Sequence, residues 1–518
     1  MKTLVIGLDG ASFNLIDPWI NQGELPNLKE IKQNGVWGDM KSCLPPVTSP
    51  NWKCYSTGKN PGKIGIFWWE NIDPKNKKFY FPRHRIYKNK ELWDYIGEKE
   101  KKVGILNMPT TYPPKKVNGF MVSGAPDAEN EEFAYPNDLE HYLKKNYNYK
   151  IRPESSVLEK SEKYVQEILE IIENRFEVAK DLLEKENLDF LHVTIFYINM
   201  LHHYFWNNEY VKNGWKLIDK KIGELIKKEK YNVIIMSDHG SNEVELIFNI
   251  STWLEREGYL KIKIKLTNFL YKLGIKREKL SRLVHILHIE KILRKIVPRK
   301  IISITPRKDG KIRGQDKSYI VNWNKTKVLP SSHGPIYVNL DKNTREYENF
   351  VNELIKKLDN VKNPLTSKKV VNKVYKKEEI YSGEYLKEAP DLIIDPAKGV
   401  RISDHTGKKD IFEIPKKLNS PKSPRSWRAE NKKTGLFMAY GPDIKNNKKI
   451  DDVSILDLAP TILHMFNISI PNDMDGKVLK EILKEDSELA KRPIKYQEID
   501  EKDRIKKKII EMKVLGKL

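Results

Sequence analysis

Two short apolar runs that each lead into a carboxylate constrain the fold more than any other feature of this chain. Residues 4–8 are followed by Asp9 and a glycine, and residues 233–236 are followed, after one serine, by Asp238, His239 and a glycine. Apolar runs of this length are typical of strands buried inside an α/β sheet. Because ligands bind at the carboxyl ends of the strands in such sheets, we expect Asp9, Asp238 and His239 to lie together and to hold a cation.

Strand-like and helix-like segments alternate through the first half of the chain. The pattern predicts an α/β fold with a mostly parallel central sheet covered by helices on both faces. The expected strands are residues 3–8, 103–107, 120–123, 190–196 and 233–237, with later ones at 336–339, 370–374, 392–395 and 435–440. The expected helices are residues 28–33, 157–184, 210–228, 347–358 and 455–466.

The chain of 518 residues is long enough for more than one domain. We expect residues 1–250 to form the first part of the core and residues 401–485 to return to it. Residues 251–400 are interpreted as a basic helical insertion and cap region, and residues 486–518 as a charged tail. The polar stretch 400–434, rich in proline and lysine, is predicted to be a long loop.

About half of the formal net charge of +23 comes from one segment. Residues 261–310 contain fifteen Lys and Arg residues against three acidic residues, which gives +12 of the +23. Apolar residues recur there at roughly helical spacing. Two interpretations stay open: a small helical cap with a solvated basic face, and a basic amphipathic surface that binds anionic lipid. Nucleic acid is disfavoured as a partner, because none of its common recognition motifs occurs.

The cysteines and the apolar stretches bear on the compartment. The two cysteines, Cys43 and Cys54, are interpreted as thiols, because nothing else indicates an oxidising compartment. No apolar stretch reaches the ~18–20 residues that a membrane-spanning helix needs, and residues 3–7 are too short for the apolar part of a signal peptide. We therefore expect a cytoplasmic protein and leave peripheral association with a membrane open.

A helix N-terminus is predicted near Thr48, which precedes Ser49, Pro50 and Asn51. Proline favours the first turn of a helix, and this places Thr48 at or just before the helix start. The free N–H groups and the helix dipole there stabilise anions, and a hydroxyl bound to a metal can attack phosphorus. The alternative is a threonine that only caps the helix.

A second polar cluster follows the strand expected at residues 190–196. Asn199 and His203 are four residues apart, so one helical turn would place them on one face. Asp238 and His239 offer adjacent oxygen and nitrogen donors after a buried strand, and this pair suits Zn²⁺, Mn²⁺ or Fe²⁺. A histidine with a purely structural role remains the alternative.

In this order, the fragments resemble the type I phosphodiesterase and nucleotide pyrophosphatase family of the alkaline phosphatase superfamily. The resemblance runs from Met1 to about Leu483. The matching pieces are Gly7–Gly10, Pro46–Trp52, Thr57–Gly58, Gly65–Ile66, Ser237–Gly240, Asn322–Lys327, Gly334–Asn339, Gly441–Ile444, Leu456–His464 and Asp473–Gly476. The resemblance implies an alkaline-phosphatase-like core with two divalent metals astride a threonine or serine nucleophile.

One half of that implied metal centre is intact in this chain. By the resemblance, Asp9, Asp238 and His239 correspond to the ligands of one metal, and Thr48 corresponds to the bridging nucleophile. The expected cofactor is a divalent metal, Zn²⁺ or alternatively Mn²⁺ or Mg²⁺, bound as one or two ions.

The other half of the implied centre is altered. Family members place an aspartate, a histidine four residues later and a distant histidine there, where this chain has Asn199, His203 and Asn431. Asparagine brings no charge and binds metal weakly, so the resemblance implies a weakened site, one tightly held metal, or a harder cation. Asp404 or His405 would substitute only if the long loop folded inward.

These residues lead to a functional hypothesis. We expect a metal-dependent phosphoesterase that cleaves phosphodiester or pyrophosphate bonds, in which Thr48 attacks in line and water hydrolyses the covalent intermediate. Asn51 or Asn71 would bind a non-bridging oxygen of the substrate. The substrate would be a small-molecule or lipid-linked phosphoester.

Three alternatives to this hypothesis stay open. A phosphomonoesterase or a phosphomutase-type enzyme of the same superfamily would use the same centre. A sulfatase is disfavoured, because residues 48–52 lack the arginine of the sulfatase pattern. A catalytically impaired protein that binds a phosphoester without cutting it would follow from the two asparagines at the metal centre.

Overall fold

The computed structural model describes residues 2–82, 88–157, 161–227, 231–263, 317–415, 427–498 and Ile509. The chain forms two compact units. The first comprises Met1–Ile66, Arg83–Val244 and Pro415–Leu518, and the second comprises Phe67–Pro82 and Glu245–Ile414. The sequence predicts boundaries at residues 250 and 400, and the breaks between the two units fall after Val244 and Ile414.

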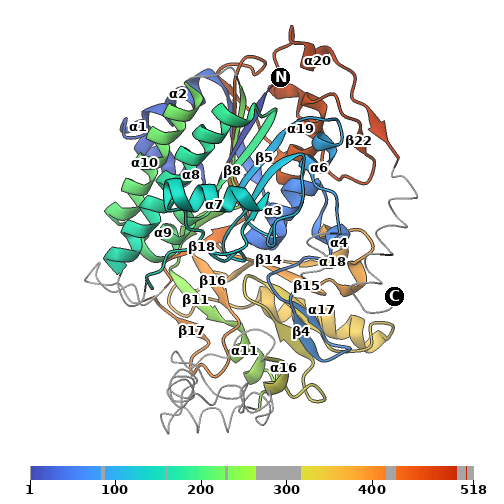
Figure 1. Ribbon diagram of the computed structural model, residues 1–518. Helices are drawn as coiled ribbons and strands as arrows, with labels where there is room; N and C mark the ends of the chain where they lie inside the picture. Colours follow the sequence, from blue (N-terminus) through green and yellow to red (C-terminus); the bar gives the residue numbers. More distant parts are fainter. Residues whose placement is uncertain are drawn as a thin grey trace, which may run out of the picture. The chain divides into compact units, whose positions relative to one another are not determined.

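A ten-stranded, mostly parallel sheet forms the centre of the first unit (Figure 1). Strands β9, β1, β8, β5 and β6 run parallel, and β19 lies antiparallel between β9 and β2. In sheet order the strands are β20 (Lys448–Lys449), β2 (Val36–Lys41), β19 (Thr434–Tyr440), β9 (Asn232–Met236), β1 (Thr3–Leu8), β8 (Phe190–Ile195), β5 (Val103–Met108), β6 (Gly119–Ser123) and β7 (Ala134–Tyr135), and β21 (Val453–Ser454) also pairs with β2.

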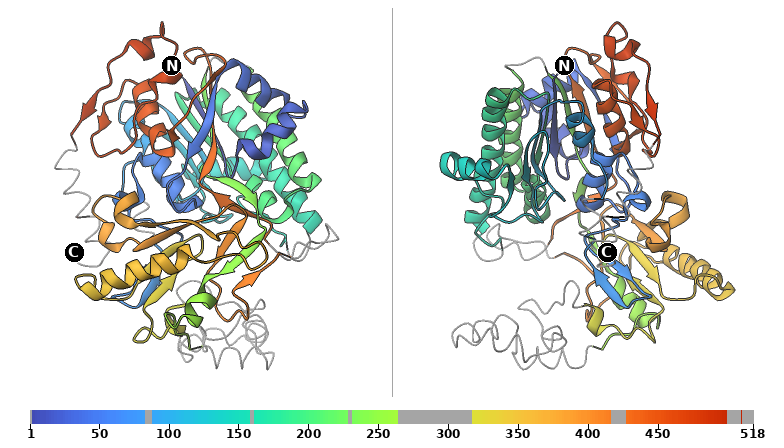
Figure 2. Two further views of the ribbon diagram at one scale, coloured as in Figure 1. Left: turned by 180° about the vertical axis from the view of Figure 1, so that it is seen from behind. Right: turned by 45° about the vertical axis from the view of Figure 1, so that its right-hand side comes forward.

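Helices cover both faces of this sheet, as the right-hand view of Figure 2 shows. One face packs against α1 (Phe13–Asn21), α2 (Pro26–Asn34), α7 (Asn137–Tyr147), α8 (Ser161–Glu186), α9 (Tyr197–Phe205) and α10 (Glu209–Ile226). The other packs against α3 (Thr48–Thr57), α4 (Pro61–Ile64), α6 (Leu92–Gly97), η3 (Ile455–Asp457), α19 (Leu458–Met465), η4 (Lys480–Ile482) and α20 (Glu488–Lys491). The expected α/β architecture is confirmed.

The apolar sequence of β1 explains why this strand lies at the centre. Its side chains point alternately to the two faces, so that Leu4, Ile6 and Leu8 join one hydrophobic core and Val5 joins the other. Every residue of β1 is buried, and after Thr3 the strand carries no polar side chain. The first carboxylate of the chain, Asp9, therefore follows directly after the strand.

The second unit is built on smaller sheets. A four-stranded antiparallel sheet has the order β12 (Val328–Pro330), β13 (Pro335–Val338), β15 (Leu392–Pro396) and β14 (Val371–Lys376). The other strands are β16 (Val400–Ser403), β11 (Leu246–Asn249) and β17 (Phe412–Glu413) in one sheet, and β3 (Asn71–Asp73) with β4 (Lys78–Tyr80) in a hairpin. The helices are α11 (Ile250–Arg256), α16 (Lys317–Ile320), α17 (Arg345–Asp359), α18 (Lys377–Ile380) and η2 (Leu386–Glu388).

The stretch 400–434 is not one long loop, and that expectation is wrong. It contains β16 and β17, and also β18 (Ala429–Lys432), which pairs with β10 (Gly240–Glu243) in the first unit. The short strands are stabilised by partners far away in the sequence, so local composition does not reveal them. A further short pair in the first unit joins β22 (Ile470–Pro471) to β23 (Tyr496–Gln497).

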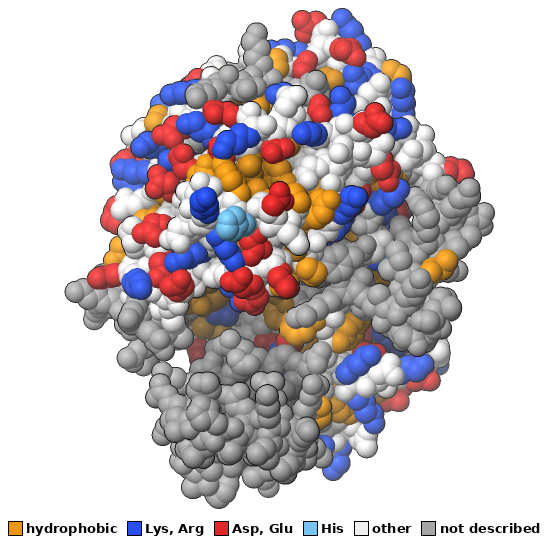
Figure 3. Space-filling view, in the orientation of Figure 1, with side chains coloured by type: hydrophobic (Ala, Val, Ile, Leu, Met, Phe, Trp, Pro, Cys, Tyr) orange, Lys and Arg blue, Asp and Glu red, His pale blue; other side chains and the backbone are white. Residues whose placement is uncertain are grey.

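Several sequence expectations concern residues outside the described ranges. The helices expected within 261–310 lie there, apart from residues 261–263, and so does the tail 499–518, apart from Ile509. On the face shown in Figure 3, basic and acidic side chains are intermixed over the helices of the first unit. Within the described part of the chain, no helix combines the length and apolar character needed to cross a bilayer. Cys43 and Cys54 are free thiols.

A buried charge cluster anchors helix α3. The Nζ atom of Lys53 lies 2.6 Å from Oε1 of Glu91, and both side chains are buried, with exposed fractions of 3% and 2%. The Ser56 hydroxyl donates to the same oxygen at 2.9 Å, and Lys115 pairs with Glu91 Oε2 at 2.9 Å. Because two α3 side chains end on one carboxylate, Glu91 fixes the helix that carries Thr48.

Replacing Glu91 with glutamine should lower the free energy of unfolding by about 3–5 kcal/mol, because the substitution leaves the buried Lys53 ammonium without its carboxylate. Equilibrium urea denaturation measures the change. Glu488→Gln is the matched control, because Glu488 pairs with Arg492 on the surface and is 85% exposed. The control should change stability by less than about 0.5 kcal/mol. Equal effects of the two substitutions would contradict the anchoring role of Glu91.

Candidate metal centre and nucleophile

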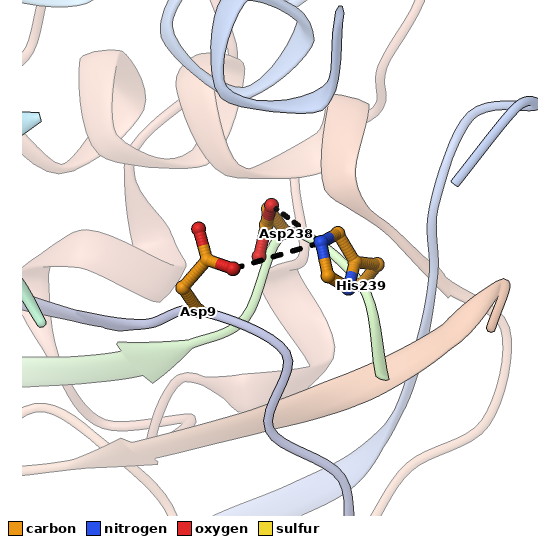
Figure 4. Close-up of side chains that lie close together, drawn as sticks. All are labelled: Asp9, Asp238 and His239. Carbon is orange, nitrogen blue, oxygen red and sulfur yellow. Dashed lines mark ion pairs between the residues drawn. The ribbon is translucent and has the colours of Figure 1, made fainter. Parts of the chain in front are cut away.

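The carboxyl ends of the central strands bring the sequence-distant carboxylates together. Gly7 of β1 is in register with Met236 of β9, so the two neighbouring parallel strands end at the same level. Asp9 follows the end of β1 and Asp238 follows the end of β9. Figure 4 shows the side chains of Asp9, Asp238 and His239 pointing toward one another.

The three side chains form a compact set of donor atoms. Nε2 of His239 lies 3.2 Å from Oδ2 of Asp238 and 3.6 Å from Oδ1 of Asp9. One donor atom from each residue lies within 4.8 Å of the others, and all three residues are fully buried. Among the described residues, this is the one group of three or more His, Cys, Asp and Glu side chains that could hold a metal ion.

The tautomer of His239 follows from its main-chain contact. Its Nδ1 lies 3.0 Å from the carbonyl oxygen of Gly240. A carbonyl oxygen can only accept, so Nδ1 carries the proton and the lone pair of Nε2 faces the carboxylates. A lone pair that faces carboxylate oxygens at these distances is repelled unless a proton or a cation lies between them.

The pKa values of the two carboxylates also indicate that a proton or a cation compensates their charge. Burial, and then repulsion by Asp238, raises the pKa of Asp9 to about 8. Burial likewise raises the pKa of Asp238 to about 8. Oδ2 of Asp238 is buried without a hydrogen-bond partner, whereas its Oδ1 accepts from the Gly10 N–H at 3.3 Å. Two carboxylate donors and one imidazole nitrogen fit a divalent cation of the zinc or manganese type.

Thr48 is the first residue of α3 and lies beside this donor set. Its Oγ1 is 3.2 Å from Nε2 of His239, and the residue is buried. The N-cap residue Val47 makes no side-chain capping bond, so N–H groups of the first turn remain available to an anion. The expected placement of Thr48 at a helix N-terminus is confirmed.

Asn51 holds the loop that leads into α3. Its Oδ1 accepts from the Cys43 N–H at 2.8 Å, and its Nδ2 donates to the carbonyl oxygens of Cys43, Pro45 and Val47 at 3.2, 3.1 and 3.0 Å. The side chain is fully buried. In this structure its polar atoms form hydrogen bonds with main-chain groups of the loop that precedes Thr48.

The two asparagines at the altered half contact the donor set through their amide groups. Nδ2 of Asn199 donates to Oδ1 of Asp9 at 2.7 Å. Nδ2 of Asn431 lies 3.0 Å from Nε2 of His239 and donates to the Pro46 carbonyl at 3.0 Å. Oδ1 of Asn431 is buried without a hydrogen-bond partner. The structure therefore brings Asn199 and Asn431 to the centre.

His203 contacts strand β18 and an aromatic ring. Its Nδ1 donates a hydrogen bond to the Ala429 carbonyl oxygen at 2.8 Å, because a carbonyl oxygen can only accept. Its ring stacks on Trp427 with 3.8 Å between the ring centroids. His203 shares helix α9 with Asn199, as the spacing predicts.

Three further expected residues belong to the second unit. Asn71 is buried there, where its Oδ1 accepts from the Phe67 N–H at 3.3 Å. Asp404 pairs with Lys317 at 2.7 Å, and His405 lies 4.0 Å from Asp404. Burial opposes ionisation of Asp404, but the charges of Lys317 and His405 and the hydrogen bonds from Lys317 and Ser332 together outweigh it and hold the pKa of Asp404 well below its usual range. These contacts lie within the second unit.

Two residues of the centre were missed by the sequence reasoning. Nε1 of Trp52 donates to Oδ2 of Asp9 at 3.1 Å. The Ser241 hydroxyl donates to the Gly10 carbonyl at 2.8 Å. Trp52 lies one helical turn after Thr48, so the helix predicted there already placed it on the same face. A Cβ at Gly7 would lie 2.4 Å from the Trp52 ring, which explains the glycine inside β1.

Comparisons with known proteins agree with this architecture. A family model described as type I phosphodiesterase / nucleotide pyrophosphatase matches residues 3–426. A second model, for the C-terminal part of N-sulphoglucosamine sulphohydrolase, matches residues 425–509. No curated protein matches the sequence.

Two solved structures are similar at low sequence identity. Human ectonucleotide pyrophosphatase/phosphodiesterase 5 is 15% identical, with a TM-score of 0.49, and the match covers 93% of this chain and 100% of that chain. Phosphonoacetate hydrolase from Sinorhizobium meliloti, solved in complex with phosphonoformate, is 12% identical, with a TM-score of 0.52, and the match covers 89% of this chain and 94% of that chain. The second similarity supports the fold. Because the first family model spans most of the sequence, the chain belongs to the type I phosphodiesterase/nucleotide pyrophosphatase family.

Proposed function

We propose that the protein is a metal-dependent phosphoesterase that cleaves phosphodiester or pyrophosphate bonds with Thr48 as the nucleophile. The observation that carries the proposal is the Thr48 hydroxyl, 3.2 Å from His239 Nε2, at a helix N-terminus beside two buried carboxylates. Membership of a family of phosphoester hydrolases supports it.

Asp9, Asp238 and His239 would hold the cation, with the Thr48 hydroxyl next to it. When bound, a divalent cation of the zinc, manganese or magnesium type lowers the pKa of a hydroxyl and neutralises charge on a phosphoryl oxygen. We propose one tightly held ion per chain, because the Asn199 amide already donates to Oδ1 of Asp9. Asn199 stands where the resemblance places an aspartate ligand of a second cation, so an N–H group and not a negative charge faces the centre.

The chain's own residues divide the reaction between them. Oγ1 of Thr48 loses its proton to solvent and attacks phosphorus; a P–O bond to the enzyme forms, and the leaving group departs with the electron pair of the broken bond and takes up a proton from solvent. The N–H groups of the first turn of α3 stabilise the negative charge on the non-bridging oxygens. Water then cleaves the Thr48 ester and regenerates the hydroxyl. Asn51 acts as a positioning residue, because it fixes the loop before Thr48.

A second candidate function is favoured by one observation. Asn199 and Asn431 contact the centre through N–H groups where a fully equipped two-metal site would need electron-pair donors. A protein that binds a phosphoester without cutting it would have such a centre. The two functions differ in turnover, which a substrate panel measures.

Purified protein, supplied in turn with Zn²⁺, Mn²⁺ and Mg²⁺, should be assayed on bis-(p-nitrophenyl) phosphate, p-nitrophenyl phosphate and p-nitrophenyl sulfate. We expect kcat/KM for the diester to exceed that for the monoester by at least about tenfold, with no sulfatase activity. A faster monoester reaction would establish a phosphomonoesterase instead. No turnover of any substrate with any cation would favour the binding protein.

The substrate proposed is a small-molecule or lipid-linked phosphoester. A cytoplasmic location, with contact to an anionic membrane surface through residues 261–310, stays a prediction based on the charge of that segment. Co-sedimentation with anionic and neutral vesicles at low salt distinguishes the membrane contact from its absence.

A further inference from the structure

A buried arginine in the first unit has no carboxylate partner among the described residues. Arg175 lies in the middle of α8 and is 3% exposed. Its Nη2 donates to the Lys150 carbonyl at 2.6 Å, and its guanidinium lies 4.2 Å from the ring centroid of Tyr149. Its Nη1 is buried without a hydrogen-bond partner. A buried charge with an unused donor is costly unless an anion compensates it.

A small cavity lies next to this guanidinium. Its accessible volume is about 10 Å³, and Arg175, Asn107, Thr194 and Tyr197 are among the residues that line it. A volume of this size holds about one water-sized species, so a tetrahedral oxyanion such as phosphate is too large. Helix α8 packs against both β8 and α9 (Figure 1).

The N-terminus of α9 opens onto the same cavity. Phe196 is the N-cap residue of this nine-residue helix and makes no side-chain capping bond. Phe196 and Tyr197 both line the cavity. The first N–H groups of a helix and its dipole favour a negative charge at this position. Positive potential therefore reaches the cavity from two independent sources, the Arg175 guanidinium and the start of α9.

We propose that this cavity binds one small inorganic anion of halide size, with chloride as the physiological representative. The anion accepts hydrogen bonds from Arg175 Nη1 and from the first turn of α9, and it fixes the junction between β8 and α9. Asn199, which contacts Asp9, lies in that first turn. The site is separate from the metal centre, and the inference does not depend on the proposed catalytic function.

The direct test is a crystal of the protein grown or soaked in sodium bromide. An anomalous difference peak within hydrogen-bonding reach of Arg175 Nη1 is expected. A site that contains only water, with no anomalous signal in bromide, would overturn the proposal.

Thermal unfolding gives a second test in solution. The melting temperature in sodium chloride should exceed that in sodium gluconate of equal ionic strength by about 2 °C, if chloride is present at roughly ten times its Kd. Arg175→Met should abolish the difference, and replacement of a buried charge by an apolar side chain is often tolerated. Arg492→Met is the matched control, because Arg492 pairs with Glu488, and it should keep the chloride response. Equal melting temperatures of the wild type in the two salts would overturn the proposal.

Discussion

Replacing Thr48 with alanine is expected to lower kcat/KM on the preferred phosphoester by about 10⁴-fold, because the substitution removes the attacking oxygen. The fold should persist, since the side chain contributes one buried hydroxyl and a methyl group. Cation binding should also persist, because Asp9, Asp238 and His239 are unchanged. Steady-state kinetics with saturating cation measures the loss, and isothermal titration of the cation checks that the centre is intact.

The matched control for this prediction is Thr48→Ser. Serine keeps the hydroxyl at the helix N-terminus, so we expect it to retain measurable turnover and to form the same covalent ester. Mass spectrometry of acid-quenched reactions should find the added mass on residue 48 in the wild type and in Thr48→Ser but not in Thr48→Ala. Full activity of Thr48→Ala would refute the proposed nucleophile.

The second large effect is expected for Asp238→Asn. The substitution should stabilise the metal-free protein and should weaken the binding of metal. The raised pKa values of Asp9 and Asp238, about 8 each, lie above the unfolded value of about 4. The metal-free protein therefore loses stability as the pH rises from about 4 to 8, because the carboxylates must ionise in a buried site. Replacing one of them removes part of that penalty.

At pH 8 the metal-free Asp238→Asn protein should therefore melt at a higher temperature than the metal-free wild type. Its affinity for the cation should fall by at least about 100-fold, so that added metal no longer raises the melting temperature. Thermal unfolding with a chelator and then with added Zn²⁺ or Mn²⁺ measures both effects. At pH 5 the metal-free difference should shrink, because the folded wild type then keeps its protons.

Asp219→Asn is a control for which we expect the opposite change in the melting temperature of the metal-free protein. Asp219 is also buried, but its oxygens accept from Asn27 Nδ2 at 2.8 Å and from the Leu28 N–H at 2.7 Å. Its replacement should lower the melting temperature and leave the response to metal unchanged. If Asp238→Asn behaved in the same way, the electrostatic account of the centre would fail.

The parts of the fold that follow from local sequence were predictable. The bounds of β1 match the expected strand, since a run of apolar residues ends where Asp9 begins. The register of two parallel neighbours then places Asp9 and Asp238 at one edge, so the donor set follows from strand ends alone. The start of α3 at Thr48 follows from the proline in its first turn.

The parts that depend on distant contacts were not predictable. β18 exists because β10 pairs with it across nearly 190 residues of sequence, and its own composition is that of a loop. The role of Asn51 depends on the path of the loop from Cys43 to Val47, which no periodic pattern encodes. The contact from Trp52 to Asp9 needs both the helix and the sheet to be placed.

The central claim is that Asp9, Asp238 and His239 gather around one cation beside the Thr48 hydroxyl. A crystal structure of the protein with Mn²⁺ or Zn²⁺, with anomalous data collected at the metal edge, tests it most directly. We predict one strong peak per chain, within about 2.0–2.3 Å of a donor atom from each of the three residues, with Thr48 Oγ1 beside it. A peak bound elsewhere, or a Thr48 hydroxyl turned away from the metal, would contradict the account.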